Sequence, residues 1–490
     1  MGHIDELPTE LLVEIFRLVR DEHWLSWTQV MGVCRRWRDV AWSTPSLWTT
    51  LRAHKRFSEP QVLDKFLRRS GSLNLDVTLR VNPAYCDTLL NAILPHRNRL
   101  RALTLFFVRW KVPLVQKVLN SVAGPIRDLS LCCASSPAPM IPISAVAFPS
   151  LRSLRTDAIL PAPRSATFRF DGVTRLHVSN VSRLARPDPL APLEYHLLNT
   201  LAAFPDLEEL ELKDALPSIW QVEGIPTNMV VLEKLRTLRL EDSIRDIQLF
   251  LGHITIPTSA SLEVVAHLTG LAWVPFGDGG FLSILPENHE TTLPMVKQAT
   301  VLRLLAGHME GGGVELIGSS EGTCPWSVTI KSPKTLLKSF IACALSDIPD
   351  LAYDLPDLEE LEVHVSPYVP FVDCSWEETL DELPMLRKLV VGGLSNAQDL
   401  VDGLYEGQYG VLGLEELELC LERPPIAVAE KLYLRCERGR VPRGVENVVM
   451  KLPPHVEDVP PYQKTMFSTM VVPLDFKVVH GYCPACHACQ

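Results

Sequence analysis

The sequence predicts an α/β protein in which a short all-helical unit precedes a long array of parallel strands. Two apolar segments rich in tryptophan occupy the first 48 residues, and a leucine-containing unit returns along most of the remaining chain. In such an array we expect strands on a concave face and helices or turns on the convex face. The expected boundaries are a helical unit over 1–52, a linker helix over 53–72, the strand array over 73–440 and an irregular, proline-rich tail over 441–490.

The composition indicates a globular protein. The chain has 490 residues, of which 47% are apolar and 21% are charged, and its formal charge is −11. A pI of about 5.7 argues against nucleic acid as a partner. No window reaches the roughly 18 apolar residues that a membrane span requires, acidic residues interrupt the segment that a signal peptide would need, and the scattered cysteines favour reduced thiols. We therefore expect a protein of the cytoplasm or the nucleus that does not bind membranes.

Two segments near the N-terminus predict a helical hairpin. The first, "LPTELLVEIFRLV" at 7–19, has Pro8 where a helix tolerates proline, Glu10 at the positive helix end, and apolar residues at helical spacing. The second, "VCRRWRDVAWSTPSLW" at 33–48, is also amphipathic, and Pro45 ends its helix because the preceding residue is disfavoured from helical geometry. A hairpin this small has more apolar surface than it can bury, which indicates a partner protein.

Taken together, these segments resemble an F-box, and most closely the F-box of large fungal families of F-box proteins. The resemblance implies that the unit binds the Skp adaptor, and through it the cullin, of an SCF-type ubiquitin ligase. The residues that match the family's adaptor contacts are Leu7, Pro8, Leu11, Leu12, Ile15, Phe16, Val33, Cys34, Trp37 and Trp48. Between the two helices the chain departs from the family, since Trp24-Leu25-Ser26-Trp27 replaces the usual leucine-rich start.

The repeated unit has the form L-x-x-L-x-L. Clear copies are "FPDLEELELKDA" at 204–215, "LEKLRTLRLEDS" at 232–243 and "LPDLEELEVHVS" at 355–366, and the leucines at 361, 389 and 417 lie 28 residues apart. The pattern and period resemble a leucine-rich repeat, in which each unit supplies one short strand to a parallel sheet. An alternative is a set of unrelated strands in an ordinary mixed domain. The predicted strands centre on the pairs 103/105, 129/131, 176/178, 210/212, 238/240, 262/264, 302/304, 328/330, 361/363, 389/391 and 417/419.

The residues between these leucines should face the open side of the sheet. The predicted target-binding residues on that side are Glu209, Glu211, Arg239, Glu241, Glu360, Glu362, Glu416 and Glu418. Their excess of negative charge suggests a target that presents a basic segment to the C-terminal half of the array. The alternative is that the glutamates only keep a long sheet soluble.

The chain ends in "HGYCPACHACQ", where Cys483, Cys486 and Cys489 stand beside His480 and His487. This spacing occurs among zinc ligands, but nothing nearby would hold the geometry, so we favour an incidental cysteine tail and expect no metal and no cofactor. Phosphate-binding loops, the H-E-x-x-H motif and the G-x-S-x-G motif are absent from the sequence. The sequence therefore predicts no catalytic residues and no enzymatic activity.

These expectations combine into a substrate receptor. The F-box would bind the Skp adaptor and its cullin, and the repeats would hold an unknown target protein for ubiquitination by other subunits. The alternative is an F-box scaffold that binds partners without promoting ubiquitination.

Overall fold

The chain forms two compact units, Met1–Glu209 (unit 1) and Leu210–Gln490 (unit 2). In the computed structural model, the described residues are 7–22, 27–53, 60–81, 86–122, 124–134, 139–163, 169–181, 193–216, 229–267, 281–306, 313–320, 325–331, 347–348, 350–351, 355–365, 376, 380, 383, 385–392, 400, 414–420, 447–452 and 475–480.

Unit 1 begins with two helices and two 3₁₀ turns: α1 (Thr9–Glu22), η2 (Trp27–Gly32), α2 (Arg35–Ser43) and η3 (Pro45–Trp48). The predicted start of the first helix at Pro8 and the predicted end of the second before Pro45 are confirmed. Helix α1 starts directly after Pro8, whose carbonyl oxygen accepts a 3.2 Å hydrogen bond from the Leu12 N–H. Helix α2 stops at Thr44, which has an extended backbone because Pro45 follows it.

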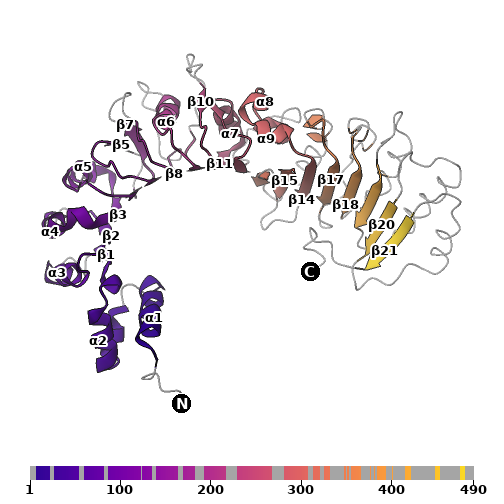
Figure 1. Cartoon of the computed structure of the whole chain (residues 1–490). Helices are drawn as coiled ribbons and strands as arrows, with labels where there is room; N and C mark the ends of the chain where they lie inside the picture. The colour runs from indigo at the N-terminus through magenta and orange to yellow at the C-terminus, as the bar shows by residue number, and fades with distance from the viewer. Residues whose placement is uncertain are drawn as a thin grey trace, which may run out of the picture. The chain divides into compact units, whose positions relative to one another are not determined.

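The remainder of unit 1 is built on a parallel sheet whose strands lie side by side in the order β1-β2-β3-β4-β6-β8. Leucines 103, 129, 154 and 176 are aligned across four of these strands and are buried. Three helices follow one another along one face of the sheet (Figure 1). The elements are β1 (Thr50–Ala53), α3 (Pro60–Arg69), β2 (Leu75–Arg80), α4 (Cys86–Ile93), β3 (Leu100–Phe107), α5 (Val112–Ser121), β4 (Asp128–Cys133), β6 (Ser153–Asp157) and β8 (Arg175–Ser179).

Shorter elements complete unit 1. The 3₁₀ turns are η4 (Leu94–Arg99) and η5 (Arg109–Lys111), and the helix is α6 (Leu193–Ala202). Strands β5 (Met140–Ile143) and β7 (Leu160–Pro163) form a separate parallel pair. Ala158 and Asn180 close strands β6 and β8 with φ angles of 54° and 57°. This left-handed backbone turns the chain sharply after each strand, and nothing in the repeat pattern indicated it.

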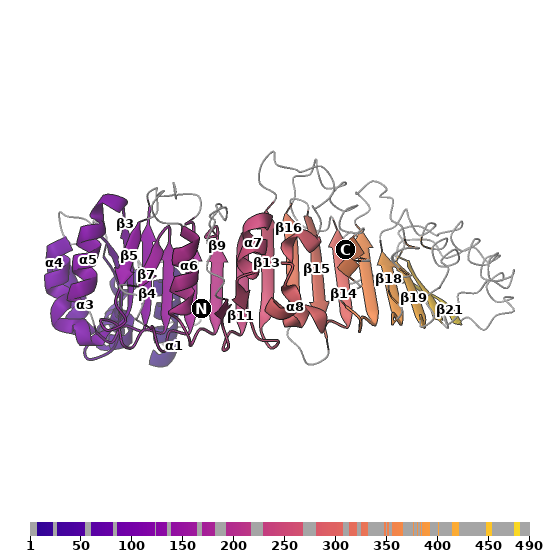
Figure 2. The same cartoon turned by 90° about the horizontal axis from the view of Figure 1, so that it is seen from above.

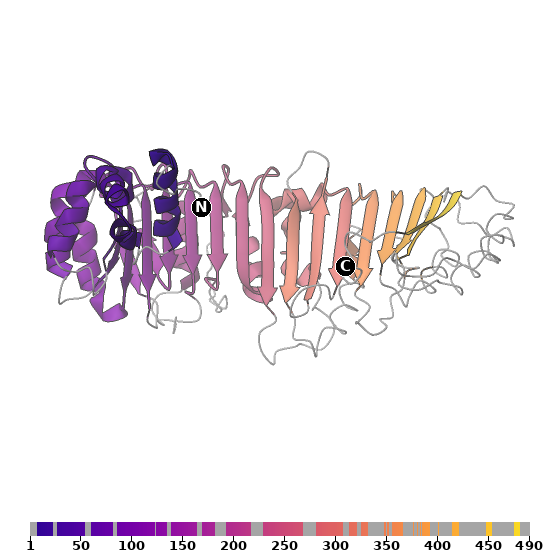
Figure 3. The ribbon, with the colours of Figure 1, turned by 90° about the horizontal axis from the view of Figure 1, so that it is seen from below.

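In unit 2 the strands also lie side by side, with helices on one face (Figure 2), and Figure 3 shows the opposite face of the same strands. Its strands are β9 (Glu209–Lys213), β11 (Thr237–Ser243), β13 (Ser261–His267), β14 (Val301–Ala306), β15 (Gly313–Ser319), β16 (Trp326–Lys331), β17 (Glu360–Val365), β18 (Lys388–Gly392), β19 (Glu416–Cys420), β20 (Asn447–Leu452) and β21 (Asp475–His480). Its other elements are the pair β10 (Val230–Val231) and β12 (Ile254–Thr255), and α7 (Ile244–Leu251), η7 (Phe281–Ile284), α8 (His289–Thr292) and α9 (Pro294–Lys297). Every predicted leucine pair lies in a strand of unit 1 or unit 2, which confirms that part of the prediction.

One strand of unit 2 runs against the others, so the expected all-parallel arrangement is wrong there. Strand β15 pairs antiparallel with both β14 and β16, while β16 pairs parallel with β13 and β14 pairs parallel with β17. The order in space is therefore β13-β16-β15-β14-β17, with the three central strands reversed relative to the chain. The physical reason is the short connections within this group, which favour antiparallel neighbours over crossovers.

The sheet also extends beyond residue 440, where the sequence predicted an irregular tail. Strand β20 pairs parallel with β19, and β21 pairs parallel with β20. The segments "NVVMKL" and "DFKVVH" lack the L-x-x-L-x-L unit, so a search for that unit misses them. Their valines nevertheless favour extended strands. Helix α3 lies within the predicted linker over 53–72.

Candidate functional site

Helix α1 carries apolar side chains on two sides. Leu12 and Phe16 are completely buried against the rest of the helical region. Leu11, Ile15 and Leu18, at helical spacings of four and three, point outward with 51%, 36% and 64% of their surfaces exposed. We call Leu11, Ile15 and Leu18 the outer row. Among the described residues nothing covers the outer row, and exposed apolar surface of this kind marks interaction sites.

Aromatic rings hold the inner side together. The rings of Phe16 and Trp37 meet edge to face with centroids 5.2 Å apart, and those of Trp27 and Trp48 do so at 5.0 Å. The Trp48 ring also lies 4.8 Å from that of Phe66 on α3, so the helical region is packed onto the first helix of the sheet region. The Trp48 indole N–H donates a 2.8 Å hydrogen bond to the carbonyl oxygen of Ala41.

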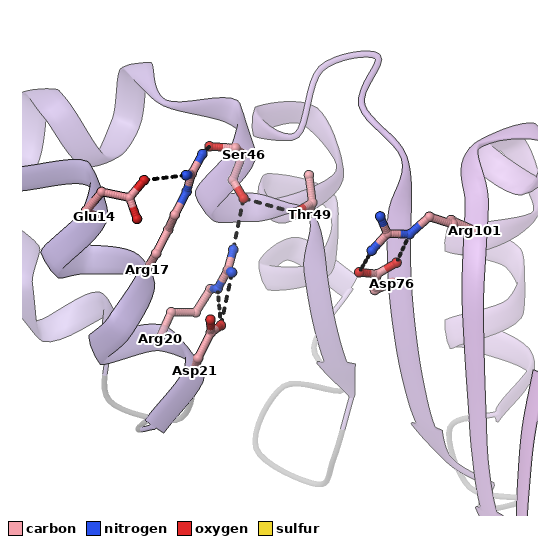
Figure 4. A network of polar contacts seen from close by, with 8 residues as sticks. All are labelled: Glu14, Arg17, Arg20, Asp21, Ser46, Thr49, Asp76 and Arg101. Atoms are coloured by element: carbon pink, nitrogen blue, oxygen red, sulfur yellow. Dashed lines mark hydrogen bonds and ion pairs between the residues drawn. The ribbon is translucent and has the colours of Figure 1, made fainter. Parts of the chain in front are cut away.

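A polar cluster fixes the rotation of α1 (Figure 4). Arg17 pairs with Glu14 at 2.6 Å and donates a 3.2 Å hydrogen bond to Ser46 Oγ in η3. Arg20 donates a 2.9 Å hydrogen bond to the Ser46 carbonyl oxygen, which also accepts one from Thr49 Oγ1. With Leu12 and Phe16 buried and both arginines anchored to η3, α1 must present its outer row to solvent.

The structure divides the predicted adaptor-binding residues into three groups. Pro8, Leu11, Ile15 and Val33 are exposed, whereas Leu7, Cys34 and Trp37 are half-buried. Leu12, Phe16 and Trp48 are buried, so they support the surface from inside and do not themselves reach a partner.

Two exposed residues were missed, Leu18 and Trp42. For Leu18 the signal was present, because it continues the helical spacing of Leu11 and Ile15. Trp42 is 47% exposed, and the Arg69 guanidinium carbon lies 5.0 Å from the centre of its ring.

In unit 2 the predicted target-binding acids are largely engaged by cations on neighbouring strands. Lys213 Nζ lies 2.6 Å from Glu241, and Lys388 Nζ lies 2.8 Å from Glu360. Burial alone would raise the pKa of Glu241, but hydrogen bonds from Lys213 and His267 hold it below its usual value. Opposite charges on adjacent strands stabilise a sheet in this way.

The same holds for Arg239, whose Nε lies 2.9 Å from Glu263 on the adjacent strand. Glu209 is exposed, and Glu211 and Glu416 are half-buried. The strand face of unit 2 therefore presents less uncompensated negative charge than the sequence alone suggests, which weakens the expectation of a basic target segment.

A partly buried group of polar side chains lies on β14 and β17, where it alternates with their buried apolar residues. Arg303 makes a two-pronged ion pair with Glu362, and His364 Nε2 lies 3.7 Å from the same carboxylate. Burial alone would raise the pKa of Glu362, but hydrogen bonds from His364 and Arg303 and their charges lower it to about 2. Glu418 is only 7% exposed, because β19 is buried on both faces, so its predicted role as a surface contact is wrong.

Within the part of the chain that the structure describes, no group of three or more His, Cys, Asp or Glu side chains is arranged to hold a metal ion. The predicted tail residues Cys483, Cys486, Cys489 and His487 lie outside the described residues, and for His480 the structure describes the backbone alone. None of the described helices has the length and apolar character needed to cross a membrane.

Residues 4–54 match the family described as F-box-like. The match covers α1, η2, α2, η3 and β1, and therefore includes the outer row. F-box domains generally bind Skp-family adaptors, so the match supports adaptor binding as the role of this surface. A search of curated proteins finds no match to the chain.

Proposed function

We propose that the chain is the substrate-recognition subunit of an SCF-type cullin–RING ubiquitin ligase. The observation that carries the proposal is an outward-facing apolar row on a helix that lies within an F-box-like match. Leu11, Ile15 and Leu18 would bind the Skp adaptor, with Val33 as a further contact. Apolar anchors of this kind supply most of the free energy in a protein interface when a partner excludes water from them.

We further propose that the strands beyond the helical region form an irregular array of the leucine-rich-repeat type that binds the target. Three features support this reading: the aligned buried leucines, the helices on one face of each sheet, and the 28-residue step between the aligned residues 361, 389 and 417. The target would bind on the strand face that bears no helix.

The proposed mechanism is one of proximity. A target held on this chain meets the charged conjugating enzyme at a high effective concentration, because both are tethered to one assembly. The chain itself is proposed to catalyse no reaction.

The test is co-purification of the full chain with its host's Skp adaptor. We compare wild type with the double variant Leu11→Asp and Ile15→Asp, and with Leu73→Asp as a control, because Leu73 is an equally exposed leucine in unit 1 outside α1. The loss of an interface anchor costs about 2 kcal/mol or more, so the outer-row variant should bind at least about 30-fold more weakly.

Wild type and the Leu73 control should form stoichiometric complexes. Failure of folded wild type to bind the adaptor would refute the proposal. If the complex forms but target abundance is unchanged when the outer row is mutated in cells, the chain is an F-box scaffold and not a substrate receptor.

A further inference from the structure

Charge is distributed unevenly between the two units. Of the chain's 47 lysines and arginines and 58 aspartates and glutamates, 26 and 19 lie in Met1–Glu209, giving unit 1 a net charge of +7. The remaining 21 and 39 lie in Leu210–Gln490, giving unit 2 a net charge of −18. The acidic character of the whole chain therefore conceals a basic unit.

The face of the unit 1 sheet that bears no helix carries part of this positive charge. On β2 the leucine side is buried, while Asp76, Thr78 and Arg80 alternate with it on the other side. Along one edge of that face the acids are already neutralised, because Asp76 pairs with Arg101 and Asp128 pairs with Arg175.

Two arginines on this face have no such partner. Arg80 on β2 and Arg155 on β6 are exposed, and neither makes an ion pair with another described residue. The acid on this face nearest to Arg155 in sequence is Asp157, whose Oδ1 accepts hydrogen bonds of 2.9 Å from Ser179 Oγ and 2.7 Å from Asn180 Nδ2. Both donors are neutral, so Asp157 keeps its negative charge. Positive charge nevertheless prevails among the described residues of the face, which carry five arginines (Arg52, Arg80, Arg101, Arg155, Arg175) and three aspartates (Asp76, Asp128, Asp157).

An exposed aromatic ring and hydroxyl groups lie between the two arginines. Phe106 on β3 is the register partner of Arg80 and has 42% of its surface exposed, which is unusual for a phenylalanine on a sheet. Ser130 on β4 is the register partner of Arg155 on one side and of Thr104 on the other. Across β2, β3, β4 and β6 the surface thus carries an arginine, an exposed aromatic ring, hydroxyl groups and a second arginine.

We propose that this face of unit 1 binds an extended acidic segment of the target, with two carboxylates paired to Arg80 and Arg155 and an apolar side chain against Phe106. This inference rests on the proposed function, and it names the chemistry of the target. It replaces the basic segment that the sequence suggested for unit 2.

The spacing of the two arginines defines the segment. Three strand steps of about 4.8 Å and one two-residue offset along the strands place their Cα atoms roughly 16 Å apart. An extended chain advances about 3.3 Å per residue and repeats its side-chain direction every second residue. Carboxylates four positions apart with an apolar residue midway would therefore face both arginines and Phe106 together, since the arginine side chains are long enough to cover the remaining distance.

A short acidic peptide fits this surface better than a nucleic acid does. Nucleic-acid sites gather cations into a continuous stripe that follows the phosphates, whereas here two arginines stand apart with a phenylalanine between them.

The experiment measures binding of a fluorescein-labelled peptide to the full chain by fluorescence anisotropy. The probe is a dodecapeptide whose centre reads glutamate, serine, leucine, serine, glutamate, and the reference peptide carries glutamine in place of glutamate. The face variant is Arg80→Glu with Arg155→Glu. The matched control is Lys65→Glu with Arg97→Glu, which makes the same charge change in unit 1 at exposed cations on α3 and η4.

Wild type and the control should bind the glutamate peptide, and should bind it more weakly as ionic strength rises because exposed charges are screened. The face variant should bind at least about tenfold more weakly, and Phe106→Ala should also lose affinity. The glutamine peptide should not bind.

Absence of binding by wild type, or equal loss in the control variant, would overturn the inference. Tighter binding of a single-stranded oligonucleotide than of the acidic peptide would also overturn it, as would binding of a phosphorylated peptide alone. Each protein is assayed in parallel for adaptor co-purification. If the wild type binds the adaptor but not the peptide, this inference is refuted and the proposed function is unaffected. If the wild type does not bind the adaptor, the proposed function itself is refuted.

Discussion

At the scale of single residues, the tryptophans near the N-terminus have different roles. Trp27 and Trp48 are buried with Phe66, and the Arg69 guanidinium carbon lies 4.5 Å from the centre of the Trp48 ring. Trp42, in contrast, is exposed. A cluster of aromatic residues in a sequence therefore does not by itself identify a docking surface, because it can equally be the joint between two parts of one unit.

The contrast between Trp48 and Leu18 gives a first prediction. Trp48→Ala should destabilise unit 1 by about 3–5 kcal/mol, because it empties a closed aromatic cluster and removes a hydrogen bond to Ala41. Leu18→Ala should change stability by less than about 0.5 kcal/mol, because its side chain is already exposed. Denaturant unfolding of both variants measures the difference, and equal stabilities would contradict the packing described.

The half-buried carboxylate of Glu362 predicts a pH-dependent effect. Because its pKa is lowered from 4.5 to about 2, the ionised form favours the folded state. Its contribution is therefore complete above about pH 5 and declines as the pH falls through 4.5 toward 2. Glu362→Gln should lower the unfolding temperature at pH 7 and have a much smaller effect near pH 2. The same loss at both pH values would show that the charge of Glu362 is not what stabilises the sheet.

At the scale of elements, the reversed strand β15 depends on close packing between neighbours. A Cβ atom at Gly318 would overlap the indole ring of Trp326 on β16, and Trp326 is buried. The antiparallel pairing sets Gly318 directly opposite Trp326. A glycine next to a large aromatic residue is therefore a requirement of this part of the sheet.

Gly318→Ala should consequently destabilise unit 2 by about 1–3 kcal/mol, the usual cost of overpacking a closed core. Adding Trp326→Leu should restore part of that loss, because the smaller side chain makes room for the new methyl group. The measurement is a double-mutant cycle by chemical denaturation. Additive effects of the two substitutions would show that the two residues are not in contact.

At the scale of the whole molecule, the strands that follow residue 440 extend the described sheet beyond β19. Strand β19 is flanked by β18 on one side and β20 on the other, and β21 follows β20. Removing β20 and β21 would leave β19 as an uncovered edge, which invites aggregation.

A chain shortened to residues 1–440 should therefore unfold at a lower temperature than the full chain and aggregate more readily. A chain of residues 1–480 retains β21 and serves as the control, so it should match the full chain. Thermal unfolding with light scattering compares the three. Equal behaviour of the 1–440 chain would mean that the last two strands contribute nothing to stability.

Much of this architecture was predictable because its signals are local. Pro8 and the Thr44–Pro45 pair limit the two N-terminal helices through their own backbone geometry, and alternating leucines locate the strands through their period of two. For the candidate site, helical spacing predicted that Leu11, Leu12 and Ile15 belong to an apolar helix face. It did not tell the exposed Leu11 and Ile15 from the buried Leu12, because α1 is apolar on both sides.

The amino-acid sequence alone predicts two kinds of segment in this chain: a helical region that resembles an F-box, and strands marked by leucines. Which strands are neighbours, and therefore which charges pair, depends on the tertiary structure. Arg303 and Glu362 are 59 residues apart in the chain and become an ion pair only because β14 lies beside β17. Arg80 and Arg155 make no ion pair within the described part of the chain, for the same reason. Strand register is set by burial over the whole sheet, which no local pattern contains.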